Sequence, residues 1–154
     1  MQRNLTYQIY LNKILIIGFL FLYAFITPIS PLFPPLIGAV AYLAYTTRTR
    51  LSLGVVLAFL LVFEALRGYP VFVSWGLFVV WAHVLIPQFS LNVICKHCIP
   101  FVAVVMFHGI YTLLLLLLGT LYNLDITIDP LFVVYYCLVD ILIIFVAMRL
   151  RRWG

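Results

Sequence analysis

Hydrophobic residues fall into six long runs, separated by short stretches that carry prolines, polar residues and most of the charges. The runs cover approximately residues 9–27, 32–47, 51–67, 71–90, 99–121 and 131–149. A helix that crosses a bilayer needs about 20 apolar residues, within a range of about 17–25. The first, fourth, fifth and sixth runs meet this length, whereas the second and third are short. The pattern predicts an all-α membrane protein with six transmembrane helices in a single domain, residues 1–154.

Composition and charge support this interpretation and give it an orientation. Hydrophobic residues make up 67% of the chain and charged residues 8%, which is too apolar for a soluble domain of this length. The net charge is +5. The basic residues lie between the apolar runs, so they indicate membrane topology rather than nucleic-acid binding. If both termini are cytoplasmic, eight of the nine basic residues lie on the cytoplasmic side, as the positive-inside rule requires. They are Arg3, Lys13, Arg48, Arg50, Lys96, Arg149, Arg151 and Arg152.

The connection after the first run and the start of the second run have distinct compositions. The stretch ITPISPLFPP contains four prolines, which end one helix and precede another, so we expect it to be an external turn. The second run then carries small residues at Gly38, Ala39, Ala41 and Ala44. Small residues allow helix backbones to approach closely in lipid, so these four are expected at helix contacts.

The stretch EALRGYP places two of the chain's few charges at the end of the third run. Glu64 and Arg67 are three residues apart, so they share a helix face and are expected to pair. Gly68 is suited to end the helix, and Pro70 to begin the next one. Two interpretations follow: an interfacial ion pair beside a tight turn, or a polar corner that binds a partner through Glu64, Arg67, Gly68 and Pro70.

Three ionisable residues, His83, His108 and Asp140, lie inside the fourth, fifth and sixth runs. An ionisable residue within a membrane span is a candidate functional site. Asp140 is the strongest candidate because it lies near the centre of its run. Its carboxylate is expected either to hydrogen-bond a neighbouring helix, for instance His108 or Tyr136, or to serve a proton relay or ligand pocket.

Cys95-Lys96-His97-Cys98 has the spacing of a redox or zinc-binding pair. A membrane thiol oxidoreductase would need a second cysteine pair, and Cys137 stands alone. Motifs for nucleophilic, metal-dependent or phosphate-cradling chemistry are absent from the sequence. We therefore expect a non-enzymatic protein without a catalytic residue, metal or cofactor, and keep a thiol redox role through Cys95 and Cys98 as an alternative.

Residues 53–80, LGVVLAFLLVFEALRGYPVFVSWGLFVV, resemble the corresponding region of the rod shape-determining protein MreD family. Glu64 stands where that family usually has aspartate, and Gly68 matches the glycine of its turn. FPPLIGAVAYLAY, residues 33–45, and the basic tail MRLRRWG are also similar to this family. Glu64 in place of aspartate and Arg67 within the turn depart from the family pattern.

The resemblance implies a subunit of the cell-elongation complex, which organises peptidoglycan synthesis in a bacterial inner membrane. Its implied partners are the lipid bilayer, the bitopic protein MreC and, through it, the actin-like filament protein MreB and the peptidoglycan polymerase and transpeptidase. Arg149, Arg151 and Arg152 would contact anionic lipid or a cytoplasmic partner. An alternative is the substrate-binding subunit of an energy-coupling-factor vitamin transporter, although the small-residue docking motif usual in its first helix is not evident here.

Overall fold

The computed structural model describes residues 2–47, 49–92, 98–124, 126 and 128–152, and its only regular elements over these residues are helices. The π-helical turn η1 joins α4 and α5 without a break, so each of the six predicted runs corresponds to one continuous helical stretch. The all-α prediction is therefore confirmed. The elements are α1 (Gln2–Ile26), α2 (Ile37–Thr47), α3 (Arg50–Arg67), α4 (Val73–Val80), η1 (Trp81–Leu85), α5 (Ile86–Asn92), α6 (Ile99–Tyr122) and α7 (Pro130–Arg152).

Two of these helices are long and apolar enough to cross a membrane. Ile99–Tyr122 and Pro130–Arg149 have mean hydropathies of 2.4 and 2.6 over their most apolar windows. Apolar stretches in the other helices are shorter and include Ile14–Ile26, Ile37–Thr47 and Val73–Phe89. Length and composition therefore support membrane crossing by α6 and α7.

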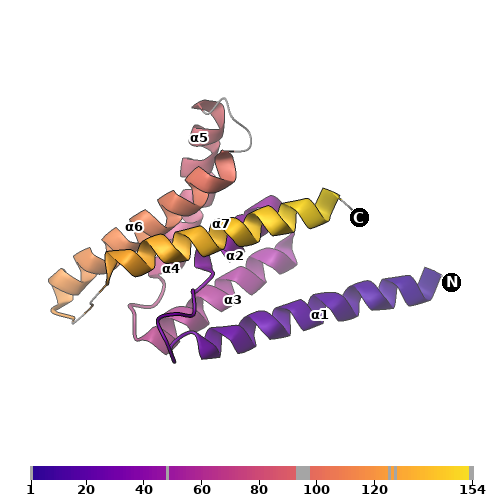
Figure 1. Cartoon of the computed structure of the whole chain (residues 1–154), viewed down its shortest axis with the longest axis horizontal. Helices are drawn as coiled ribbons and strands as arrows, with labels where there is room; N and C mark the ends of the chain where they lie inside the picture. The colour runs from indigo at the N-terminus through magenta and orange to yellow at the C-terminus, as the bar shows by residue number, and fades with distance from the viewer. Residues whose placement is uncertain (1, 48, 93–97, 125, 127, 153–154) are drawn as a thin grey trace.

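Helix α2 lies at the centre of the molecule, where it packs against α3, α6 and α7. Helix α1 lies at the edge and packs mainly against α3 (Figure 1). The N-terminal end of α1 and the C-terminal end of α7 lie on the same side of the molecule (Figure 1). This arrangement leaves one face of α7 and many apolar side chains of the second half of α1, from Ile14 to Ile26, uncovered.

Small residues allow α2 to occupy this central position. Ala39, Ala41 and Ala44 are at most 3% exposed, and Gly38 is buried with them. Side chains this small let three neighbouring helices approach the α2 backbone closely. The prediction that these four residues lie at helix contacts is confirmed.

Replacing Ala41 with leucine is expected to destabilise the protein by about 1–3 kcal/mol, because Ala41 is fully buried and a larger side chain would overpack the contacts of α2. Thermal unfolding in detergent measures the effect. Ala65→Leu is the matched control, since Ala65 is exposed on α3. Equal unfolding temperatures for the two variants would show that α2 is not tightly packed.

The π-helical turn in the fourth run ends two residues before a proline, Pro87. Pro87 lacks an N–H group and its ring clashes with the carbonyl four residues earlier, so regular α-helical bonding cannot continue through it. The chain widens instead, and the Ile86 N–H bonds the Trp81 carbonyl five residues back. Trp81 is fully buried and its indole N–H donates to the Ala103 carbonyl at 2.9 Å. This bond links the widened turn to α6.

Candidate functional site

Helix α3 ends at Gly68, as predicted. Gly68 has φ +67°, a left-handed conformation that glycine adopts without steric cost. Its N–H bonds the Ala65 carbonyl, and the N–H of Tyr69 bonds the Glu64 carbonyl at 3.0 Å. These two bonds form a Schellman motif, which satisfies carbonyls at the helix end. Pro70 does not begin the next helix, however, because α4 starts only at Val73.

Glu64 does not face outward. Its side chain is fully buried, and its two carboxylate oxygens accept hydrogen bonds from the start of α4. Oε2 accepts from the Phe72 N–H at 2.9 Å, and Oε1 accepts from the Ser74 N–H at 2.6 Å. The Tyr111 hydroxyl of α6 donates a longer bond of 3.4 Å to Oε1. Glu64 therefore caps the N-terminus of α4, where a negative charge is favourable.

The expectation that Glu64 and Arg67 form an ion pair is wrong. Within the described residues, the ion pair is formed by His108 and Asp140. Arg67 turns towards α1, where its Nη2 donates to the Thr27 carbonyl at 2.9 Å. Its guanidinium carbon lies 5.6 Å from the centre of the Phe63 ring. The pair does not form because the Glu64 carboxylate turns inward to the start of α4, whereas the Arg67 guanidinium turns to the end of α1.

Phe72 is held in an uncommon conformation at the corner between α3 and α4. Its φ is +74°, a region that costs a residue with a side chain about 1–3 kcal/mol. The bond from its N–H to Glu64 helps to hold this conformation. The Phe72 ring is 57% exposed and packs edge-on against Trp75, with 5.3 Å between ring centres. The corner thus presents an aromatic side chain at the surface and keeps its acid inside.

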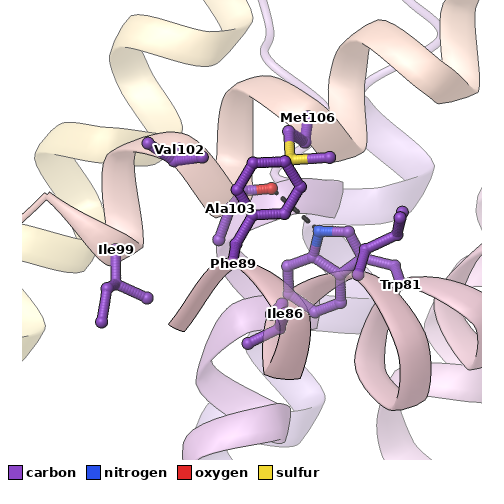
Figure 2. Close-up of a pocket in the computed structure, with 8 residues that line it drawn as sticks. Trp81, Ile86, Phe89, Ile99, Val102, Ala103 and Met106 are labelled. Atoms are coloured by element: carbon purple, nitrogen blue, oxygen red, sulfur yellow. Dashed lines mark hydrogen bonds between the residues drawn. The ribbon is translucent and has the colours of Figure 1, made fainter. Parts of the chain in front are cut away.

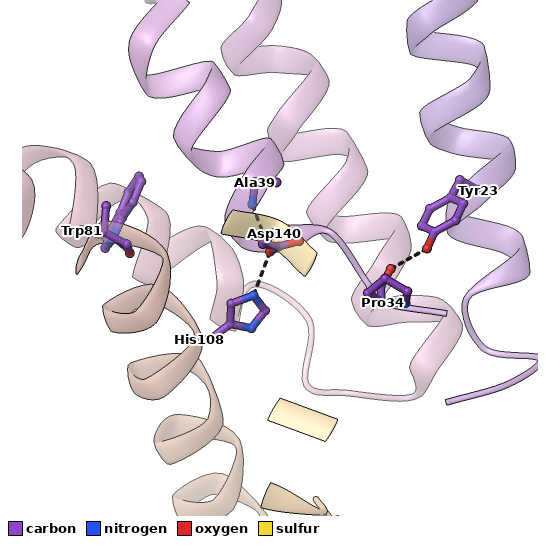
Figure 3. Close-up of polar contacts among 7 residues, drawn as sticks. Tyr23, Pro34, Ala39, Trp81, His108 and Asp140 are labelled. Atoms are coloured by element: carbon purple, nitrogen blue, oxygen red, sulfur yellow. Dashed lines mark hydrogen bonds and ion pairs between the residues drawn. The ribbon is translucent and has the colours of Figure 1, made fainter. Parts of the chain in front are cut away.

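Asp140 forms a second buried cap at the start of α2 (Figure 3). Its Oδ2 accepts from the Ala39 N–H at 3.0 Å and lies 2.8 Å from His108 Nε2. Asp140 is fully buried and His108 is 3% exposed. Because a carboxylate only accepts, Nε2 donates when Asp140 is ionised. The predicted interhelical bond between Asp140 and His108 is confirmed, and it joins α2, α6 and α7.

Gly38 makes room for this contact. A Cβ atom at Gly38 would lie 2.8 Å from Asp140 Oδ2 and 3.1 Å from the ring of His108. Real Cβ contacts are longer than this, so the carboxylate could not approach the Ala39 N–H beside a larger residue. The glycine is therefore required by the close approach of α7 and α6 to the end of α2.

Gly38→Ala is expected to destabilise the protein by about 1–3 kcal/mol, because the added methyl group displaces Asp140 from its bonds. Gly18→Ala on α1 is the matched control. A Cβ there meets no atom within 4 Å, and alanine is the better helix former by up to about 1 kcal/mol. Unfolding temperatures in detergent should fall for Gly38→Ala and stay unchanged or rise for Gly18→Ala.

The two caps share a design. Each short helix follows a residue with positive φ, Leu36 before α2 and Phe72 before α4, and each receives a buried carboxylate at its N-terminus. Helix α6 contacts both carboxylates through His108 and Tyr111, which lie three residues apart on one face. The protein's own acids therefore occupy the positions where a discontinuous membrane helix can bind an anion.

Few polar atoms at these caps lack partners. Asp140 Oδ1 and the Ser74 hydroxyl are buried and find no hydrogen-bond partner among the described residues. The same described region holds no group of three or more histidine, cysteine, aspartate or glutamate residues that could bind a metal. The chemistry of the caps is thus hydrogen bonding that fixes the helix ends.

The other predicted site residues lie apart from the caps. His83 is exposed on η1, so it does not join His108 and Asp140. Arg149 is exposed near the end of α7, and the side chains of Arg151 and Arg152 lie outside the described residues. Cys95, Lys96 and His97 also lie outside them, so the redox alternative stays a prediction. Cys98 is exposed just before α6.

An apolar crevice lies between α5 and α6 (Figure 2). Trp81 forms part of its wall, with its indole nitrogen turned to the Ala103 carbonyl. The side chains lining it are apolar or aromatic, so it offers no group for acid–base or metal chemistry. Its lining residues are Trp81, Leu85, Ile86, Phe89, Ile99, Val102, Ala103 and Met106.

Tyr136, named as a possible partner of Asp140, instead donates to the Pro31 carbonyl at 2.7 Å. The structural roles of several other tyrosines were not predicted from the sequence. Tyr111 lies beside Glu64, and the hydroxyls of Tyr23 and Tyr135, like that of Tyr136, bond backbone carbonyls of the proline-rich connection. One signal was present: Tyr111 falls well inside an apolar run, three residues after His108. A buried tyrosine hydroxyl usually finds a partner.

Comparison with known proteins adds no identification to this geometry. The sequence matches no protein-family model, and no curated protein or solved structure is significantly similar to it.

Proposed function

We propose that this protein is a non-enzymatic, multi-pass subunit of a bacterial inner membrane, which acts by binding other membrane proteins. The observation that carries the proposal is that the two buried acids bind groups of the protein's own backbone. Glu64 and Asp140 both accept hydrogen bonds from the chain's own helix ends. An enzyme or anion transporter would need such groups to be available to a substrate, whereas a scaffold needs them to hold its helices in place.

The membrane arrangement in this proposal has six crossings, with both termini cytoplasmic. The six helical stretches agree in position with the six apolar runs, and the two ends of the chain lie on one side (Figure 1). Arg50 and Arg149 are exposed at the ends of α3 and α7 that would face the cytoplasm. Such a placement satisfies the positive-inside rule.

The proposed partner is the bitopic MreC-like component of a cell-elongation complex, as the resemblance over residues 53–80 suggests. The proposed contact surface is formed by the exposed residues of the corner between α3 and α4. Phe72 is 57% exposed, Val71 44% and Leu66 37%. Glu64 and Gly68 act as positioning residues, because they set the backbone that presents Phe72. Exposed aromatic anchors often dominate protein–protein binding energy.

Site-specific photo-crosslinking in native membranes tests this function. A crosslinker at Phe72 is expected to capture a single-span MreC-like protein, identified by mass spectrometry. The control is a crosslinker at Leu142, which is 63% exposed on α7 and is expected to capture lipid alone. Phe72→Ala should leave the protein level unchanged and reduce partner recovery at least about tenfold, a size typical of one binding anchor.

Two outcomes would overturn the proposal. Equal partner recovery with wild type and Phe72→Ala would exclude the corner as a contact surface. Recovery of a pair of ATPases in place of a bitopic protein would favour the energy-coupling-factor alternative. Loss of rod shape on depletion, restored by wild type but not by Phe72→Ala, would connect the contact to cell elongation.

A further inference from the structure

The connection between α1 and α2 runs alongside the first half of α7. At its start, the Thr27 carbonyl accepts from Arg67 at the end of α3. Beyond its end, the Ala39 N–H bonds Asp140, which lies about 15 Å along α7 from Pro130 at 1.5 Å per residue. Ten residues reach at most about 33 Å when fully extended, so residues 27–36 can cover this depth even with the two turns that they contain.

Side chains from α1 and α7 satisfy the backbone of this connection. The carbonyls of Pro31, Leu32 and Pro34 accept from the hydroxyls of Tyr136, Tyr135 and Tyr23 at 2.7, 3.1 and 2.8 Å. Figure 3 shows the bond between Tyr23 and Pro34. The N–H groups of Ile29 and Phe33 bond the carbonyls of Ile26 and Ser30. Pro28, Pro31, Pro34 and Pro35 have no N–H to satisfy.

The exposed surface of this connection is apolar. Ile29 is 77% exposed, Leu32 68% and Phe33 40%. The sequence contains no charged residue between Lys13 and Arg48. A turn in water usually carries charged or small polar residues, and here Ser30 is the only strongly polar side chain between Pro28 and Leu36.

We propose that residues 28–36 lie within the hydrocarbon layer of the membrane, with Ile29, Leu32 and Phe33 against lipid acyl chains. The second crossing is then half non-helical chain, with two hydrogen-bonded turns, and half helix. Non-helical backbone is tolerated at membrane depth only where its polar groups are satisfied by the protein or by water. Four prolines remove four N–H donors, and the three tyrosines supply partners for three of the carbonyls. The inference rests on the proposed membrane placement of the chain.

A crossing whose first half is non-helical chain also explains the length of α2. Its 11 residues span about 16 Å, roughly half of a 30 Å hydrocarbon layer. The N-terminus of α2 therefore lies near mid-depth, where no water reaches its free N–H groups. Asp140 satisfies one of them from α7. In this proposal, the stretch that the sequence predicted to be an external turn is instead a segment that faces lipid.

Spin-label accessibility in lipid vesicles tests this placement. Single cysteines at Leu32, Leu142 and Asp129 are labelled in the full chain, with Cys95, Cys98 and Cys137 replaced by serine. The label at Leu32 is expected to collide with dissolved oxygen rather than with a water-soluble nickel complex. The label at Leu142, on the lipid-facing side of α7, is expected to behave in the same way. The label at Asp129, exposed just before α7, is expected to prefer the nickel complex.

The outcomes separate this inference from the proposed function. Nickel access at Leu32 with oxygen access at Leu142 would overturn the lipid-facing segment and leave the membrane protein intact. Nickel access at both positions would overturn both proposals. Replacing Tyr135 and Tyr136 with phenylalanine should raise nickel access at Leu32, because the freed carbonyls recruit water. Tyr122→Phe, at an exposed position on α6, should leave it unchanged, and an equal rise in both variants would exclude the role of the tyrosines.

Discussion

Glu64→Gln is expected to destabilise the protein by about 1–3 kcal/mol, although the change is nearly isosteric. The two oxygens of Glu64 accept from two different N–H groups, those of Phe72 and Ser74. Glutamine has a single acceptor oxygen, so its amide NH₂ must face one of these donors. A buried N–H left without an acceptor costs about 1–3 kcal/mol. Denaturant or thermal unfolding in detergent measures the loss.

Glu64→Leu extends this prediction to a larger effect. Both N–H groups lose their acceptor, and the Tyr111 hydroxyl loses its contact as well. The expected destabilisation is about 3–5 kcal/mol, the range seen when one partner of a buried polar network is removed. Hydrogen exchange at the first turn of α4 should increase at the same time. Wild-type stability for the glutamine and leucine variants would show that the acid does not cap α4.

Asp140→Leu is expected to destabilise the protein by about 3–5 kcal/mol, because it leaves His108 and the Ala39 N–H buried without their shared acceptor. Asp140→Asn should cost less, about 1–3 kcal/mol, because it keeps the shared acceptor oxygen but buries an NH₂ group without an acceptor. Both donors reach the same oxygen, Oδ2, so the single oxygen of asparagine can serve them. Its NH₂ group takes the place of Oδ1, which has no partner among the described residues.

The contrast between the two amide substitutions is the sharpest test of the caps. Glutamine at position 64 should destabilise the protein more than asparagine at position 140, since the donors divide between two oxygens in one case and share one oxygen in the other. The first change places an NH₂ group against a backbone N–H, whereas the second leaves only the NH₂ group itself without a partner. His83→Gln, at an exposed position, serves as a control that should not alter stability. The opposite order of effects would contradict the hydrogen-bond geometry.

Residue types alone indicated the helices and several of their ends. Long apolar runs favour helices, which satisfy their own backbone hydrogen bonds, and Gly68 and the prolines between α1 and α2 mark helix ends. Small residues in α2 indicated its close contacts because only such residues allow backbones to approach. Asp140 in an apolar run indicated a buried partner because an isolated charge there is costly. Each of these conclusions depends on local chemistry.

Tertiary structure decided where each charge goes. Spacing of three residues allowed Glu64 and Arg67 to pair, but spacing cannot show that the start of α4 folds back and brings two N–H donors to Glu64. Arg67 then reaches Thr27, 40 residues away. The tyrosines that support the proline-rich connection come from α1 and α7, and Gly38 meets an acid 102 positions later in the chain. Such contacts depend on how the helices pack, because donors and acceptors far apart in sequence become neighbours only after the chain has folded.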